Sequence, residues 1–320
     1  MLSLLRPIAG QLSPGGRRAR LSVLIYHRVR PRPDPLRPRE IDAATFRWQM
    51  RLLARQFRPL PLGEAAERLA RGDLPPRAVC VTFDDGYADN LTEAAPILAD
   101  CGVPATFFIA TGFLDGGRMW NDTIIETVRR LPAGPLDLSA FGLERDTPVP
   151  GPEGERVDLS KRLIDAIKYL EPAERQVRVE ALARLAGAPL PDDLMLSSAQ
   201  LRELAALPGV DIGGHTVHHP ILARLSPDQA RQEIGQGKQR LEALLNREIN
   251  CFAYPNGKPD TDYRDEHVAM ARDCGFATAV STRWGVSTSE TDRWQLRRFT
   301  PWDRTPARFM TRLLLNLRQH

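Results

Sequence analysis

Two adjacent aspartates follow an apolar run in the stretch VTFDDGYADN, residues 81–90. An apolar run of this length that ends at Gly86 predicts a buried strand, and burial of adjacent carboxylates is unfavourable unless something uses them. An aspartate that caps the next helix, Asp85 or Asp89, would contribute roughly 1 kcal/mol. A cap explains one aspartate and not the pair, so Asp84 and Asp85 are candidates for chemistry.

A second polar group lies in GGHTVHHP, residues 213–220. His215 and His219 are four positions apart, and on a helical turn this spacing places both imidazoles on one face, where they can bind one ion. His218 is three positions from His215 and is a rival ligand, and a single buried histidine is more often a hydrogen-bonded core residue. With one carboxylate from Asp85, the set becomes two His and one Asp, which leaves a position open for water.

The two aspartates then have different tasks. Successive side chains of an extended segment point in opposite directions, so both cannot ligate one ion without strain. One binds the metal and the other faces the substrate. In barrel-like α/β folds the working groups sit at the carboxyl ends of the strands, and here those ends supply His27, Asp84 with Asp85, His215 with His219, and the turn YPNG.

The predicted elements that position these groups alternate between strands and helices. Apolar, β-branched or aromatic runs predict seven strands, at residues 21–27, 78–83, 105–110, 209–215, 249–255, 276–281 and 294–299. Apolar residues at helical spacing predict helices between most of them, at 44–57, 91–102, 226–245 and 265–275. Alternating strands and helices imply parallel pairing with right-handed crossovers. Seven strands indicate an α/β fold with a distorted or incomplete barrel.

The domain organisation is inferred from the segments in which this alternation of strands and helices stops. Residues 1–20 are interpreted as an N-terminal tail and residues 21–320 as one domain. The interval 116–196 is rich in Pro, Gly and charge and then becomes helical, so we expect an inserted loop and helices that cover one mouth of the barrel.

The composition of the chain limits the kinds of partner that the protein is expected to bind. The chain has 320 residues, 42% of them hydrophobic, and a formal net charge of +4. No basic stripe interleaved with aromatic residues is present, so no nucleic-acid partner is expected. The amino-terminal apolar patch is interrupted by Arg6 and Pro7, and four dispersed cysteines form no CxxC pair. These features predict a cytoplasmic protein without a transmembrane segment, and leave open a peripheral membrane contact and the number of associated chains.

The motifs TFDDGY and HTVHHP resemble the first two motifs of the polysaccharide deacetylases, the family-four carbohydrate esterases. The resemblance continues through LIYHRV, PATFFIATG, LSSAQLRELA, GVDIGGHT and CFAYPNGKPD, and covers most of residues 21–300. It implies a distorted (β/α)7 barrel and the metal-dependent hydrolysis of an N-acetyl or O-acetyl group on a sugar polymer or glycan precursor. By this resemblance Asp84 is the general base, and Asp85, His215 and His219 are the metal ligands.

The chain departs from the family pattern at two places. Ala253 stands where the third motif carries an arginine, and LRRF replaces the motif that supplies the acid histidine. Exopolysaccharide deacetylases with permuted motifs, which the chain resembles more closely, take the acid from a first strand that reads YH. His27 fits that role, and Arg298 is expected to orient Asp84, with Arg297 as a competitor.

The resemblance also implies the remaining assignments. The backbone amide of Asn256 is expected to hold the oxyanion, and substrate contacts are assigned to Tyr87, Tyr254, Pro255 and Asn256. Zinc is the first choice of divalent metal, with nickel, cobalt and iron(II) as alternatives. The tryptophans at 120, 284 and 302 stack on sugar rings or pack in the interior. The competing interpretation is a carbohydrate-binding relic of a deacetylase, which the departures at Ala253 and LRRF favour.

Overall fold

The most apolar segments of the chain form the centre of the fold, because strands that are covered on both faces need apolar side chains at every position. The computed structural model describes residues 5–319. Every residue is buried in β1 (Ser22–Tyr26), β5 (Ala78–Phe83) and β6 (Ala105–Ile109). The other long strands are β9 (Val210–Gly214), β10 (Cys251–Ala253), β11 (Thr278–Trp284) and β12 (Leu296–Arg298).

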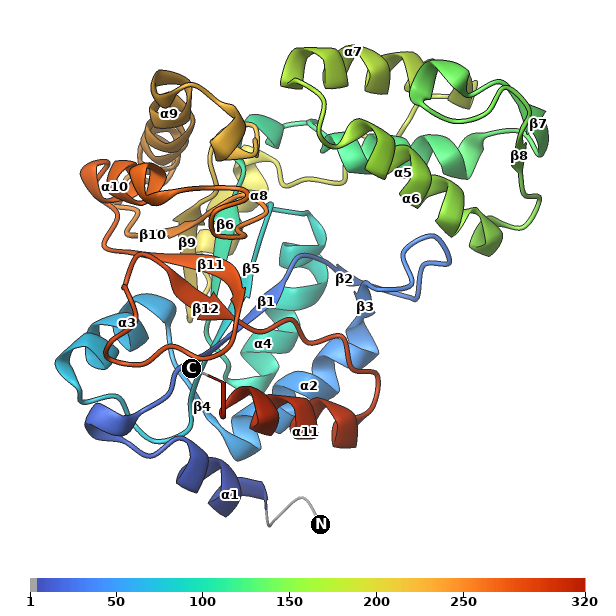
Figure 1. Cartoon of the computed structure of the whole chain (residues 1–320). Coiled ribbons are helices and arrows are strands. Elements are labelled where there is room, and N and C mark those ends of the chain that lie inside the picture. Colours follow the sequence, from blue (N-terminus) through green and yellow to red (C-terminus); the bar gives the residue numbers. More distant parts are fainter. Residues whose placement is uncertain (1–4, 320) are drawn as a thin grey trace.

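These strands form a mostly parallel sheet with the order β1-β5-β6-β9-β10-β11-β12, and β4 (Arg58–Pro59) adds to β5. Phe299, just after β12, connects the two ends of the sheet. Its carbonyl accepts from the Ile25 amide at 3.0 Å and its amide donates to the Val23 carbonyl at 2.7 Å. The sheet is therefore nearly closed (Figure 1), and the prediction of a distorted (β/α)7 barrel is confirmed.

Helices pack around the outside of the barrel (Figure 1). They are α2 (Ala43–Gln56), α3 (Leu62–Arg71), α4 (Ala95–Cys101), α8 (Ser198–Ala206), α9 (Pro227–Leu245), α10 (Asp265–Asp273) and α11 (Pro306–Asn316). Capping boxes begin α8 and α9, at Ser197 and Ser226. The helix predicted at 91–102 begins instead with a π-helical turn, Asn90–Ala94, before α4. Pro96 lacks the amide hydrogen that an unbroken α-helix would use there.

The interval 116–196 projects from the barrel as a separate group of elements, coloured green in Figure 1. It contains α5 (Trp120–Arg130), β7 (Gly134–Leu136), β8 (Thr147–Val149), α6 (Val157–Ile167) and α7 (Pro172–Ala183). Ile124, Leu163 and Leu182 are among the buried side chains of its own apolar cluster. The short parallel pair β2 (Val29–Arg30) and β3 (Ile41–Asp42) brings the loop between them beside this insertion.

The segment before β1 contains α1 (Leu5–Leu12), and Ala9 of this helix is fully buried in the main apolar core. Within residues 5–319, no helix combines the length and the apolar character that crossing a membrane requires.

Candidate metal and catalytic site

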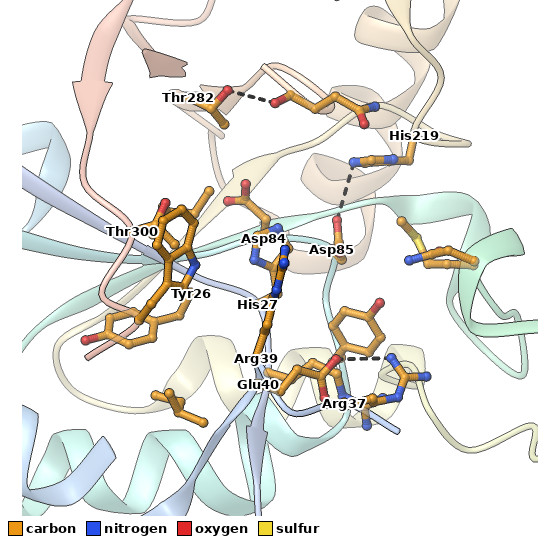
Figure 2. A pocket seen from close by; sticks show the side chains of 18 of the residues that line it. Tyr26, His27, Arg37, Arg39, Glu40, Asp84, Asp85, His219, Thr282 and Thr300 are labelled. Atoms are coloured by element: carbon orange, nitrogen blue, oxygen red, sulfur yellow. Dashed lines mark hydrogen bonds and ion pairs between the residues drawn. The ribbon is translucent and has the colours of Figure 1, made fainter. Parts of the chain in front are cut away.

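Three side chains converge where β5 and β9 end. The ligand atoms of Asp85, His215 and His219 lie within 4.8 Å of one another. The Nε2 atoms of both histidines are 3.5 Å from Asp85 Oδ1. Figure 2 shows Asp85 and His219 facing each other across the upper part of a pocket. The tertiary structure thus assembles the two-His, one-Asp set from segments that are about 130 residues apart in the sequence.

The chemistry of these three side chains fits a divalent metal. Asp85 Oδ1 is buried and has no hydrogen-bond partner among the described residues. Burying a carboxylate oxygen in this way is energetically costly unless a bound cation interacts with it. His215 Nδ1 lies 2.7 Å from the Ala253 carbonyl, and donation there leaves the Nε2 lone pair facing Asp85. Burial lowers the pKa of His219 to about 4, so this imidazole is neutral near pH 7 and can act as a ligand.

The predicted reason for the pairing of the histidines was wrong. Residues 215–219 form a loop and no helical turn. Thr216 and His219 both adopt positive φ, 66° and 53°, and the His219 amide donates to Thr216 Oγ1 at 3.0 Å. These left-handed residues reverse the chain and bring the second imidazole back toward the first. The rival ligand His218 points away, is exposed, and pairs with Glu233 at 2.7 Å.

Helix α9 holds this loop, and sequence reasoning missed the residues that do so. Glu233 Oε2 accepts hydrogen bonds from the amides of Val217 and His218, at 3.0 and 2.8 Å. One turn later, a Cβ on Gly237 would lie 2.8 Å from the Thr216 carbonyl carbon, so only glycine permits this close approach. The one available signal was the spacing of Glu233 and Gly237, four apart on one helix face.

Asp84 lies beside the ligand set but has a different partner. Arg298 Nη1 and Nη2 donate to Asp84 Oδ1 and Oδ2 at 2.7 and 2.8 Å, and both side chains are almost completely buried. Arg298 Nε donates to the Ser281 carbonyl, which fixes the guanidinium. Burial opposes ionisation of Asp84, but the charge of Arg298 outweighs it and holds the pKa of Asp84 below its usual value. Asp84 Oδ2 is 4.0 Å from His215 Nε2.

Two expectations about the aspartates require correction. Asp85 is in a turn with φ of 80°, so strand alternation is not what separates it from Asp84. Asp84 directly follows the last residue of β5, and the turn that begins at Asp85 directs the Asp85 side chain toward the histidines. Asp89 does not cap the following helix, because its carboxylate accepts from Arg28 Nε at 2.7 Å and from the Val29 amide at 3.3 Å.

Strained backbone is concentrated at the site. Eight residues other than glycine have positive φ in the described part of the chain. Four of them belong to this site: Asp85, Thr216, His219 and Asn256. Such conformations cost on the order of 1–3 kcal/mol each and persist where the surrounding structure enforces them for a function.

A cavity of about 540 Å³ opens over these groups. The carboxyl end of the barrel forms its floor, and the loop before β3, the insertion and residues 300–302 form its sides. His27 is exposed and lines the cavity together with Asp84, Asp85 and His219 (Figure 2). Trp120 and Trp302 lie along its sides, and Trp302 is 56% exposed.

The four residues assigned to substrate contact are in different environments. Asn256 lines the cavity, and its amide donates no hydrogen bond to any described residue. Tyr87 also lines the cavity but is buried, with its hydroxyl donating to Asp122 and Arg28 over its ring. Tyr254 is stacked on a second tyrosine in the core, with a centroid distance of 3.9 Å, and donates to the Trp294 carbonyl. Pro255 is buried beside it, so neither side chain reaches the cavity.

Comparisons with known proteins identify a sequence family and related folds. The sequence model of a family described as polysaccharide deacetylase matches residues 71–137 and 178–279. The Bacillus subtilis (strain 168) protein YxkH, which bears the name of a polysaccharide deacetylase, is 21% identical over 281 residues, 88% of this chain and 71% of YxkH.

Two solved structures share the fold. One is the deacetylase PplD of Streptococcus pyogenes in complex with acetate, with a TM-score of 0.63, 19% identity, and coverage of 93% of this chain and 98% of that one. The other is IcaB of Ammonifex degensii, with a TM-score of 0.58, 22% identity, and coverage of 95% and 98%.

Proposed function

The chain belongs to the polysaccharide deacetylase family and is a hydrolase acting on carbon–nitrogen bonds that deacetylates a glycan, and we propose that it removes N-acetyl groups by a metal-dependent reaction. The family membership confirms the resemblance found in the sequence motifs. Ester-linked O-acetyl groups are a further candidate substrate of the same site, in addition to N-acetyl groups. The observation that carries the proposal is the buried Asp85 Oδ1, which has no hydrogen-bond partner among the described residues and lies between two imidazole Nε2 atoms, beside a second carboxylate held by an arginine.

Asp85, His215 and His219 would hold the ion, with zinc as the first choice because two imidazoles and a carboxylate suit it. When bound, such an ion supplies Lewis acidity, which polarises a carbonyl oxygen and lowers the pKa of water. The bond from His215 Nδ1 to the Ala253 carbonyl orients that ring for the task.

Asp84 is proposed as the general base. Its lowered pKa keeps the carboxylate ionised at neutral pH, so it can take a proton from the attacking water. The two hydrogen bonds from Arg298 fix the plane of the carboxylate and leave its remaining lone pairs to the cavity. Arg298 therefore replaces the arginine that the third motif would supply, and it reaches Asp84 from β12.

The remaining steps are assigned to His27 and Asn256. The free amide of Asn256 is a donor for the oxygen of the tetrahedral intermediate, and one such donor typically contributes about 10²- to 10³-fold in rate. His27, protonated, would donate its proton to the departing amine. The product would be acetate, the molecule bound in the PplD structure.

The test combines a metal assay with acetate release from N-acetylated chitooligosaccharide. Asp84→Asn should retain a stoichiometric ion and lose activity by roughly 10²- to 10⁴-fold, the usual contribution of a general base. His215→Ala should lose both. His218→Ala is the matched control and should keep both, because that ring faces Glu233.

Loss of the ion from Asp84→Asn would reverse the two aspartate roles. Stoichiometric metal in the wild-type protein without acetate release from N- or O-acetylated oligosaccharides would support a binding protein.

A further inference from the structure

A tight turn at residues 37–40 presents one arginine to the cavity. The Glu40 amide donates to the Arg37 carbonyl at 3.0 Å, which closes the turn, and Pro38 occupies the position that favours it. Arg39 follows Pro38 and lines the cavity. In Figure 2, Arg39 and Glu40 lie on the side of the pocket opposite Thr282 and His219.

Two other arginines anchor this turn from both sides. Arg37 Nη2 donates to the fully buried Asp122 of α5 at 2.6 Å. Arg304 Nη2 donates to the carbonyls of Pro38 and Glu40, at 2.7 Å each. The backbone at Arg39 is therefore held firmly, although its exposed side chain contributes nothing to the anchoring.

The Arg39 guanidinium has no partner within residues 5–319, neither a hydrogen bond nor an ion pair. The neighbouring Glu40 pairs through Oε1 with Arg37 at 3.1 Å, and its buried Oε2 has no hydrogen-bond partner among the described residues. The other carboxylates that line the cavity are also engaged, since Asp84 pairs with Arg298 and Asp85 belongs to the ligand set. The cavity thus contains an exposed cation on a firmly held backbone, and no carboxylate among the described residues pairs with this cation.

Two further cationic groups face the same cavity. Lys168, at the end of α6 in the insertion, forms no ion pair with the described carboxylates. A cation at a helix carboxyl end also offsets the helix dipole, so the position of Lys168 by itself is not evidence for an anionic ligand. Arg28 is 94% buried, and although its Nε pairs with Asp89, its Nη1 has no partner among the described residues. A buried unpaired donor beside a cavity is available to water or to an acceptor on a ligand.

We propose that Arg39, with Lys168 and Arg28, binds an anionic substituent of the glycan, a carboxylate or a phosphate near the acetylated sugar. The proposal rests on the proposed deacetylase function and names the class of its substrate. Guanidinium and ammonium groups that converge in a cleft attract anions strongly, because the low-dielectric walls concentrate the field.

The binding test uses the full chain without metal, so it does not depend on turnover. Calorimetric titration would compare three probes of equal length: neutral N-acetylchitotetraose, the same tetramer with a 1-phosphate, and the tetramer oxidised to a terminal carboxylate. At least one anionic probe should bind about fivefold or more tightly than the neutral one. The preference should decrease between low and high salt, since exposed charges are screened.

Matched variants test which residues produce the preference for anionic probes. Arg39→Gln should remove most of the anionic-to-neutral ratio and Lys168→Gln part of it. Arg32→Gln, in the same loop but outside the cavity, and Lys161→Gln, on the same helix, should leave the ratio unchanged. A ratio below fivefold for both anionic probes, or equal ratios in Arg39→Gln and Arg32→Gln, overturns the proposal.

The probes also separate related outcomes. Preference for the phosphate alone identifies a phosphorylated glycan, and preference for both shows that a carboxylate is sufficient. If the metal-loaded protein releases no acetate from any of the three probes or from O-acetylated oligosaccharides, the proposed function fails, whatever the binding ratio. If acetate is released but the ratio stays below fivefold, only the anionic subsite is refuted.

Discussion

At the residue scale, Asp84 and Asp85 are neighbours in sequence that differ in chemistry because their partners differ. Asp84 accepts two hydrogen bonds from Arg298, whereas Asp85 Oδ1 accepts none from the described residues and lies between two imidazoles. A buried carboxylate that accepts hydrogen bonds from an arginine is stable as an anion without a metal ion. A buried carboxylate that lacks such a partner needs a bound cation. We infer that this contrast divides proton transfer from metal binding.

Arg298→Met should move the acid limb of the kcat/KM profile to higher pH. Burial raises the pKa of Asp84, and loss of the guanidinium removes the largest opposing influence, so the pKa of this carboxyl rises and the base is protonated at higher pH. In the wild type, the lowered folded pKa contributes stability above about pH 4 that is lost as pH falls through the folded value. In the variant this contribution to stability is smaller, because the folded pKa of Asp84 lies higher than in the wild type.

The same substitution should lower the free energy of unfolding near pH 7 by about 3–5 kcal/mol, measured by urea titration, because it leaves a buried charge unpaired. Arg297→Met is the control, since that neighbouring side chain is partly exposed and outside the cavity. An unshifted acid limb in Arg298→Met would show that Asp84 is not the titrating base.

His27→Ala should keep its metal and lose roughly 10²- to 10⁴-fold in kcat near neutral pH, because the departing amine loses its proton donor. The side chain is exposed in the cavity, so the substitution should change the free energy of unfolding little. Acetate release at the wild-type rate would assign the acid role to another group.

At the element scale, buried charges join the insertion to the barrel. Asp122, in the first turn of α5, accepts from Arg37 of the loop before β3 and from the Tyr87 hydroxyl after β5. Arg129 of the same helix donates to Asp34 at 2.8 Å. One carboxylate thus connects three segments that form sides of the cavity.

Asp122→Ala should reduce the free energy of unfolding by about 2 kcal/mol or more, because it removes the shortest of the ion pairs of Arg37 and leaves the buried Tyr87 hydroxyl without an acceptor. Glu153→Gln is the comparison, since its pair with Arg129 is 39% exposed on the Glu153 side and surface pairs contribute about 0–1 kcal/mol. Hydrogen exchange should rise in residues 31–40 only in the first variant. Equal losses in both would contradict the role of Asp122.

At the scale of the whole molecule, the ligand set connects β5 to β9 across β6, since Asp85 follows one strand and His215 the other. An ion bound only by the folded chain would stabilise the entire barrel by mass action.

Removal of metal with a chelator should therefore lower Tm, and metal at about 100 times its Kd should contribute about 2.7 kcal/mol. His215→Ala should have the same Tm with and without metal, and His218→Ala should respond as the wild type does. A metal-dependent Tm in His215→Ala would place the ion elsewhere.

The sequence determined the barrel and the identity of the groups that meet at its carboxyl end. All seven predicted strands are present, because residues 78–83, for example, are apolar at nearly every position and can only be buried strands. The side chains of Asp84, Asp85, His215 and His219 also meet, since parallel strands end at one edge of the barrel.

Only the tertiary structure decided how these side chains are oriented. Positive φ at Asp85, Thr216 and His219 is enforced by neighbours such as Glu233 and Gly237, and no local pattern encodes those contacts. The choice of Arg298 over Arg297, and the core position of Tyr254, likewise depend on which side chain faces inward after closure. Backbone conformation and side-chain direction at a site result from packing between distant segments, and spacing along one segment cannot specify them.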